Sequence, residues 1–243
     1  MEAWSGRFGV VSGRYHSHGD DDAPQTTIEL FGRCEDGASI CVLVSGLRPT
    51  FEIASVGKRS KDQPVTDEEE RRIDVIRRRS EVMDVRGPVW KWTDLGEKPV
   101  WTVEAVQPFN VPSLRGELQK QGWTIYSGDI PFVNRMFLDN DVGMHLAIDG
   151  FLIDEREHDD EDGERNLRVI KHGGVGRYQV DRTVSVQLEN VIESEPFQVP
   201  WRILSYDLET SIANNSILCA AVWVEDMIDG SRRIYEYRGA EDL

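Results

Sequence analysis

The sequence predicts an α+β fold in which a mixed β-sheet region with few helices is followed by a further set of strands. Short segments rich in β-branched and aromatic residues, separated by Gly and Asp, recur along most of the 243 residues. Two segments instead show the spacing of amphipathic helices. With 39% hydrophobic residues, the chain can bury the core of one large domain or two modest ones.

The first elements are expected to form a twisted antiparallel sheet from residues 8–11, 26–32 and 39–44. Asp36-Gly37 lies between the last two segments and is typical of a hairpin turn. Cys34 and Cys41 flank this turn, and the third cysteine is Cys219. Three scattered cysteines do not form a disulfide framework or a zinc site, so half-buried thiols are expected.

The first helix is predicted over residues 66–80. Thr66 and Glu69 have the spacing of a capping box, and Ile73 and Ile76 supply a short apolar stripe. Arginines cluster in the second half of this helix, where they could meet phosphate. Because four acidic residues begin the helix, i,i+4 pairing at the surface is the favoured role.

Next come two predicted strands, 89–92 and 100–106, a helix from Val111 to about Gln121, and a strand at 123–126. Pro112 is acceptable in the first turn of that helix because the missing N–H would be unpaired there. A strand, helix and strand in this order predict a small α+β module.

Aromatic residues are numerous in this module. We expect Trp101 and Trp123 to fill its core, whereas Trp90 and Trp92 fit either a core or base stacking.

The chain is acidic, with a formal net charge of -16. Eight acidic residues against two arginines lie between Asp154 and Arg165, within an acid- and Gly-rich loop predicted over 154–176. An acidic surface argues against nucleic-acid binding, which normally needs basic patches. Because one loop carries much of the charge, that class of function is not excluded.

The last part is predicted to be β-rich again. Residues 178–188 are strand-like, and after Pro196 and Pro200 a strand runs from Arg202 to Thr210. Segments 216–224 and 232–237, linked by Asp229-Gly230, predict a hairpin.

Asp207 and Glu209 stand two residues apart near the end of the strand that begins at Arg202. They therefore point to one face of it, and carboxylate oxygens are the ligands that hard divalent cations prefer.

Residues 203–210 (Ile-Leu-Ser-Tyr-Asp-Leu-Glu-Thr) resemble the first exonuclease motif of family B DNA polymerases, an Asp-X-Glu ending the first strand of an RNase H-like fold. Further segments similar to that family occur upstream in the expected order: 28–33 with Asp36-Gly37, 47–51, 107–115 and 129–138. An unrelated acidic protein with a chance Asp-X-Glu would leave this order unexplained.

This resemblance implies two regions. Residues 1–195 would be the N-terminal domain of a family B polymerase, and 196–243 the incomplete start of an RNase H-like 3′–5′ exonuclease domain. Asp207 and Glu209 would be catalytic and would bind Mg²⁺ (or Mn²⁺) only with the remainder of the exonuclease site. The family's later carboxylate motifs do not occur after Glu209, so this chain alone is expected to be inactive. A truncation, a split subunit and a full gene product all remain compatible with the sequence.

The resemblance also implies a binding pocket, because archaeal members of the family capture template uracil in their N-terminal domain. Carried over position by position, its residues would be Pro49, Pro108, Val111, Phe132 and Arg135. Apolar and aromatic walls would enclose a flipped base, and Arg135 would support a loop or backbone. The alternative is that these residues simply brace the domain, as in relatives that ignore uracil.

Two classes of function follow. The first is the N-terminal part of an archaeal-type, replicative DNA-directed DNA polymerase, with DNA template or primer and the remainder of the polymerase as partners, and a sliding clamp as a further candidate. The second is a non-catalytic module that binds single-stranded DNA or senses uracil. With no apolar run of about 18 residues and no leader pattern, a cytoplasmic, nucleoid-associated protein without a membrane partner is expected.

Overall fold

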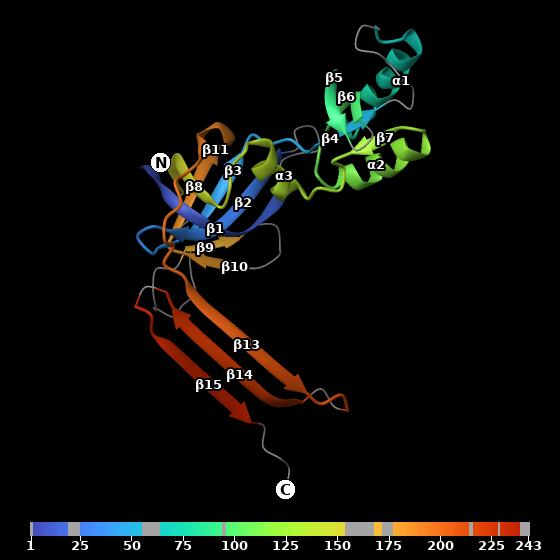
Figure 1. Cartoon of the computed structure of the whole chain (residues 1–243). Helices are drawn as coiled ribbons and strands as arrows, with labels where there is room; N and C mark the ends of the chain where they lie inside the picture. Colours follow the sequence, from blue (N-terminus) through green and yellow to red (C-terminus); the bar gives the residue numbers. More distant parts are fainter. Residues whose placement is uncertain are drawn as a thin grey trace.

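A computed structural model describes residues 2–18, 25–54, 64–93, 96–153, 168–171, 177–213, 216–227 and 229–238. Within these residues the chain forms a curved six-stranded sheet, a four-stranded sheet with two helices, a three-stranded sheet and a short hairpin (Figure 1). The six- and four-stranded sheets each enclose their own hydrophobic core, so the region predicted as one N-terminal domain contains two packed units.

The first unit is a barrel. Its strands are β1 (Glu2–His18), β2 (Gln25–Cys34), β3 (Ser39–Ser45), β8 (His145–Leu152), β11 (Arg182–Gln187) and the short β12 (Val191–Glu193). The order is β1-β2-β3-β11-β8-β12, and β1 also pairs with β8, which closes the sheet on itself. The register shift between Val10 and Ser12 in β1 marks a bulge, a device that bends a strand enough to serve two neighbours. A closed Greek-key barrel of this kind is typical of the OB fold.

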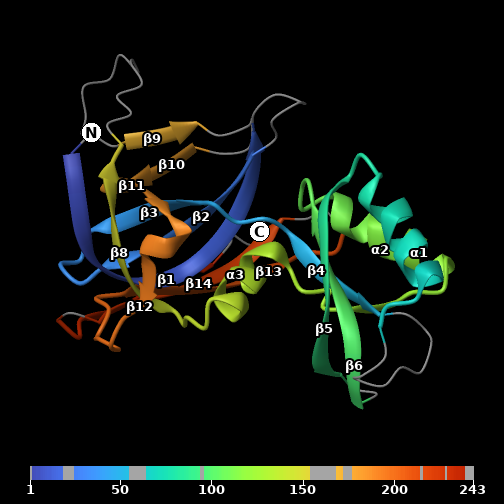
Figure 2. The same cartoon turned by 90° about the horizontal axis from the view of Figure 1, so that it is seen from above.

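The second unit is inserted between β3 and β8. It consists of β4 (Thr50–Ala54), α1 (Asp67–Arg77), β5 (Val82–Thr93), β6 (Gly96–Ala105), α2 (Asn110–Lys120) and β7 (Thr124–Tyr126). The sheet order β5-β6-β4-β7 with both helices against the sheet is the ferredoxin-like arrangement (Figure 2). The predicted strand–helix–strand unit is present, but β4 lies between its two strands.

Local signals explain how the ferredoxin-like unit begins and ends its helices. Thr66 Oγ1 accepts the Glu69 N–H at 3.2 Å, so α1 begins where the capping pattern predicts, although it ends at Arg77 rather than at residue 80. Arg77 pairs at the surface with Glu70 at 2.9 Å and Asp74 at 3.0 Å, which are i,i+7 and i,i+3 contacts rather than i,i+4.

Trp101 and Trp123 are buried in the core of this unit, as predicted. Trp92 is 82% exposed, so of the two roles predicted for it, core packing and base stacking, core packing is excluded. Cys34 and Cys41 are free thiols, and both are buried rather than half-buried.

The third sheet contains β13 (Arg202–Thr210), β14 (Ile217–Asp226) and β15 (Arg232–Arg238), all antiparallel. It confirms the predicted strand and the hairpin after it, and it extends away from the barrel in Figure 1. The linker 194–201 connects the two, and it packs on the barrel, where Val199 is buried. The Phe197 ring lies between His145, at 5.2 Å, and the guanidinium of Arg7, at 5.1 Å.

Some elements differ from expectation. Within the predicted loop 154–176, residues 168–171 form strand β9 (Arg168–Lys171), which pairs with β10 (Arg177–Val180); the rest of that loop lies outside the described residues. The predicted strand 178–188 is divided at Asp181 between β10 and β11. Helix α3 (Phe132–Asp139) and strand β8 are not among the predicted elements, although the buried Phe132, Arg135 and Met136 have the spacing of one helical face. Of the helices in the described part of the chain, none is long and apolar enough to cross a membrane.

Candidate functional site

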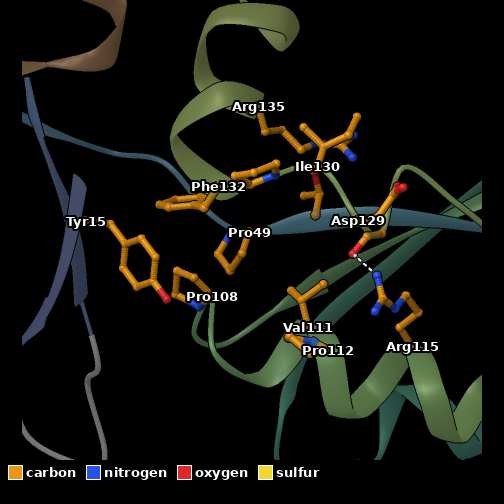
Figure 3. A pocket seen from close by; sticks show the side chains of 13 residues that line it. Tyr15, Pro49, Pro108, Val111, Pro112, Arg115, Asp129, Ile130, Phe132 and Arg135 are labelled. Carbon is orange, nitrogen blue, oxygen red and sulfur yellow. Dashed lines mark hydrogen bonds between the residues drawn. The ribbon is translucent and has the colours of Figure 1, made fainter. Parts of the chain in front are cut away.

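All five predicted pocket residues line one pocket of about 350 Å³ at the junction of the barrel and the ferredoxin-like unit (Figure 3). Pro49 immediately precedes β4, Pro108 and Val111 form the entry to α2, and Phe132 and Arg135 lie on α3. The remaining lining residues are Tyr15, Thr50, Pro112, Arg115, Gly128, Asp129, Ile130 and Pro131. A volume of this size is within the range of small-molecule sites.

The turn into α2 is tied to the barrel. The Thr26 hydroxyl of β2 donates to Gln107 Oε1 at 3.1 Å in a buried hydrogen bond, and the Gln107 N–H donates to Asn110 Oδ1 at 3.0 Å. Pro108, fixed in φ by its ring, follows directly. These bonds hold one wall of the pocket against a strand of the other unit.

An aromatic corner forms the barrel side of the pocket. The rings of Tyr15 and Phe132 meet edge to face, with centroids 5.7 Å apart and planes at 88°. Such contacts are worth about 0.5–1.5 kcal/mol beyond area burial. Tyr15 was not predicted as a site residue, because it lies in a strand far from every motif, and its role depends on β1 approaching α3.

The opposite wall is the segment 127–131, of which residues 128–131 line the pocket and Ser127 lies just before them. Ser127 has a left-handed backbone with φ of 57°, and its carbonyl accepts from Arg135 Nη1 at 3.2 Å. Gly128 leaves no room for a side chain, since an added Cβ would lie 2.9 Å from Ile125 Cγ2 and 3.0 Å from Arg115 Cδ. Arg115 Nη1 donates to the Gly128 carbonyl at 3.1 Å (Figure 3).

Arg135 is the most constrained side chain of the pocket. It is 8% exposed and also donates from Nε to Asp139 Oδ2 at 2.9 Å and from Nη2 to Glu52 Oε1 at 3.3 Å. Glu52 in turn accepts from Lys91 Nζ at 3.0 Å. Burial raises the pKa of Glu52, but the hydrogen bond from Lys91, the charge of Arg135 and a hydrogen bond from Ser127 outweigh it, so the pKa lies below its usual value.

Asp207 and Glu209 lie on β13 as predicted, and both are exposed. Their spacing puts them on one face of the sheet, where the residues directly opposite are Ala221 and Cys219. Both of these neighbours have small side chains. The opposite face carries the exposed Leu204, Tyr206 and Leu208.

Two carboxylates supply suitable oxygen ligands for a hard divalent cation, but such a cation usually needs more. The described residues contain no group of three or more His, Cys, Asp or Glu side chains that could hold a metal ion. The pair therefore fits a partial metal site and not a complete one.

Comparison with solved structures finds a relative in fold. The chain aligns with the family B DNA polymerase from the hyperthermophilic archaeon Pyrobaculum calidifontis, with a TM-score of 0.55 and 18% sequence identity. The chain is similar in fold to part of an archaeal family B DNA polymerase. The alignment covers 97% of this chain and 27% of the polymerase, so this chain spans about a quarter of that protein's length.

At this identity the likeness to the polymerase concerns the fold alone. No protein-family model matches the sequence, and no curated protein matches it.

Proposed function

We propose that this chain is the N-terminal part of a family B DNA-directed DNA polymerase, and that its pocket binds a base flipped out of the template strand. The observation that carries the proposal is the gathering of Pro49, Pro108, Val111, Phe132 and Arg135 around one pocket. These residues come from segments that resemble family B DNA polymerases, and the similarity in fold to such a polymerase is a separate support.

The chemistry of the pocket suits a pyrimidine that lacks a methyl group. Prolines, Val111 and the aromatic corner supply apolar walls, and the tightly packed Gly128 segment limits the width. Uracil and thymine differ by a single methyl, so a rigid wall discriminates between them by exclusion. A difference of this size is worth about 10-fold or more in affinity.

Asp207 and Glu209 would belong to the proofreading exonuclease of the same polymerase. Divalent metal, held by them together with carboxylates from the remainder of the polymerase, would supply the activation of water for 3′–5′ cleavage. The two side chains would hold their share of the ligands on an open sheet face. We infer that this chain alone does not cleave DNA.

The pocket is tested by equilibrium binding of the purified chain to matched single-stranded oligonucleotides with and without one uracil, at fixed salt. We expect tighter binding of the uracil oligonucleotide. Tyr15→Ala and Phe132→Ala should reduce that preference, whereas Phe109→Ala is a control, because Phe109 is 62% exposed and does not line the pocket. Equal binding of both oligonucleotides by the folded wild-type chain would refute the pocket proposal.

The exonuclease assignment is tested in the complete polymerase. Asp207→Asn and Glu209→Gln should abolish 3′–5′ cleavage and leave polymerisation intact. Glu236→Gln is the matched control, because Glu236 shares the sheet face and pairs with Ala221 on the far side from Asp207. If Glu236→Gln were as damaging as Asp207→Asn, the motif would not be the site.

A second candidate function is a non-catalytic template-binding module. It is favoured by one observation, that the pocket is built entirely within this chain. It predicts metal-independent binding of single-stranded DNA by a folded monomer that has no polymerase partner. If a polypeptide that carries the remainder of a polymerase co-purified with the natural protein, this second candidate function would be excluded.

A further inference from the structure

Glu52 is a buried carboxylate in the centre of a strand. It lies in β4 between Thr102 of β6 and Tyr126 of β7, and only 7% of the residue is exposed. Its neighbours Phe51 and Ile53 belong to the apolar core, so Glu52 points to the opposite face of the sheet, the face that Arg135 of α3 reaches. A buried charge is costly unless it is well paired, so its presence calls for a role.

Its hydrogen-bond partners come from two separate segments, Lys91 from β5 and Arg135 from α3. Arg135 also lines the pocket and donates to the carbonyl of Ser127, the residue just before the lining segment 128–131. Glu52 itself does not line the pocket.

The wall needs such support. Ser127 has φ of 57°, a conformation that costs an L-residue free energy, and its carbonyl accepts a hydrogen bond from Arg135 at 3.2 Å. Arg135 reaches the Ser127 carbonyl only with its guanidinium in the orientation that Glu52 and Asp139 impose. Loss of Glu52 would leave Arg135, which holds the Ser127 carbonyl, without one of its partners.

We propose that Glu52 is a positioning residue that holds the wall 127–131, through Arg135 and its bond to the Ser127 carbonyl, in the shape that discriminates between bases. The part of this inference that concerns base selection rests on the proposed function of the pocket. The part that concerns the wall does not. The Glu52 carboxylate does not line the pocket itself. It fixes, by a hydrogen bond, the position of a residue that does.

The wall is tested without any ligand by ¹⁵N relaxation of the backbone amides of residues 127–130 in the full chain. We expect order parameters typical of rigid backbone, about 0.85, in the wild type and below about 0.6 in Glu52→Gln. Glu52→Leu, which fills the same space without charge, should give the same result, so the conclusion does not depend on one variant folding well. Unchanged order parameters in both variants would overturn the proposal.

Glu104→Gln is the matched control. Glu104 lies on the same sheet face in β6 and pairs with Arg86 at 2.9 Å, away from the wall. It should leave residues 127–130 rigid. A loss of order there in Glu104→Gln would show that any lost carboxylate loosens the unit, and the proposal would fail.

Oligonucleotide binding then tests whether Glu52 affects the selection between uracil and thymine. In Glu52→Gln the uracil-to-thymine affinity ratio should fall about tenfold, toward one, while affinity for the thymine oligonucleotide stays within about twofold of the wild type. If the wild type showed no uracil preference, the proposed function would fail, and the relaxation measurement would still decide the role of Glu52. A loosened wall with an unchanged ratio would refute the part that concerns selection.

Discussion

Charged side chains that are buried at the junction of the two units decide the shape of the pocket. Arg135 was predicted to support a loop or backbone, and its guanidinium donates to the carbonyl of Ser127. Its orientation depends on Glu52, whose position no motif singles out. A residue that lines the pocket and a residue behind it therefore act together.

The pH dependence of stability should report on Glu52. Its pKa is lower in the folded chain than the unfolded value of about 4.3, so its stabilisation is present above that value and is lost as pH falls through the folded pKa. In urea unfolding we expect the wild type to be more stable than Glu52→Gln at pH 7, with the difference shrinking below about pH 4. A difference that is the same at pH 7 and pH 3 would contradict this.

At the scale of elements, the signals that begin helices are local, whereas the contacts that place the linker are not. Thr66 caps α1 by accepting a hydrogen bond from the N–H of Glu69, only three residues further along the chain. The linker 194–201 instead depends on a glycine in β1, because a Cβ on Gly9 would lie 2.5 Å from Val199 Cγ2. The third sheet thus takes its position from a residue near the start of the chain.

Thr66→Ala should lower the free energy of unfolding by about 1 kcal/mol, because α1 loses the acceptor for its Glu69 N–H. Urea denaturation measures the change. Thr66→Ser, which keeps the hydroxyl, should stay close to the wild type, and equal losses in both variants would argue against the cap.

Gly9→Val should displace the linker and make residues 194–201 sensitive to limited proteolysis. Gly116→Ala in α2 is the contrasting variant, since nothing lies within 4 Å of an added Cβ and alanine favours a helix by about 1 kcal/mol. It should raise stability and leave the linker protected. Protection of the linker in Gly9→Val would contradict the packing described here.

At the scale of the whole molecule, the third sheet exposes apolar side chains on both of its faces. One face carries Asp207 and Glu209 together with Ile203, Trp223 and Ile234, which are 47%, 43% and 66% exposed, and the other exposes Leu204 at 60% and Tyr206 at 67%. Apolar sheet faces of this kind are usually covered by further elements or by partners. We infer that the remainder of the proposed polymerase covers these faces.

The uncovered face should make the isolated chain self-associate. Replacing Leu204 and Tyr206 by Lys should shift it toward the monomer in light scattering after gel filtration, because the apolar contact is lost. Replacing Gln119 and Gln121, which are exposed at the end of α2 and lie outside the third sheet, by Lys is the control and should leave association unchanged. Equal effects of the two pairs of substitutions would point to net charge rather than to the apolar surface.

The sequence by itself determined the features that depend on neighbouring residues. The start of α1, Pro112 in the first turn of α2 and the hairpin after β13 follow from caps, fixed dihedrals and turn residues within a few positions. Trp101 and Trp123 could be assigned to a core because large aromatic side chains are seldom left in water. The five predicted pocket residues were identified by resemblance and not by geometry.

Only the tertiary structure decided the rest. Closure of the barrel by β1 and β8, and insertion of the ferredoxin-like unit between β3 and β8, bring together segments far apart in the chain. Through those contacts Tyr15 lines the pocket and Glu52 pairs with Arg135 behind it, and neither residue has a local pattern that reveals this role. The physical reason is that a strand's alternation tells which residues share a face, whereas what packs on that face depends on the whole chain.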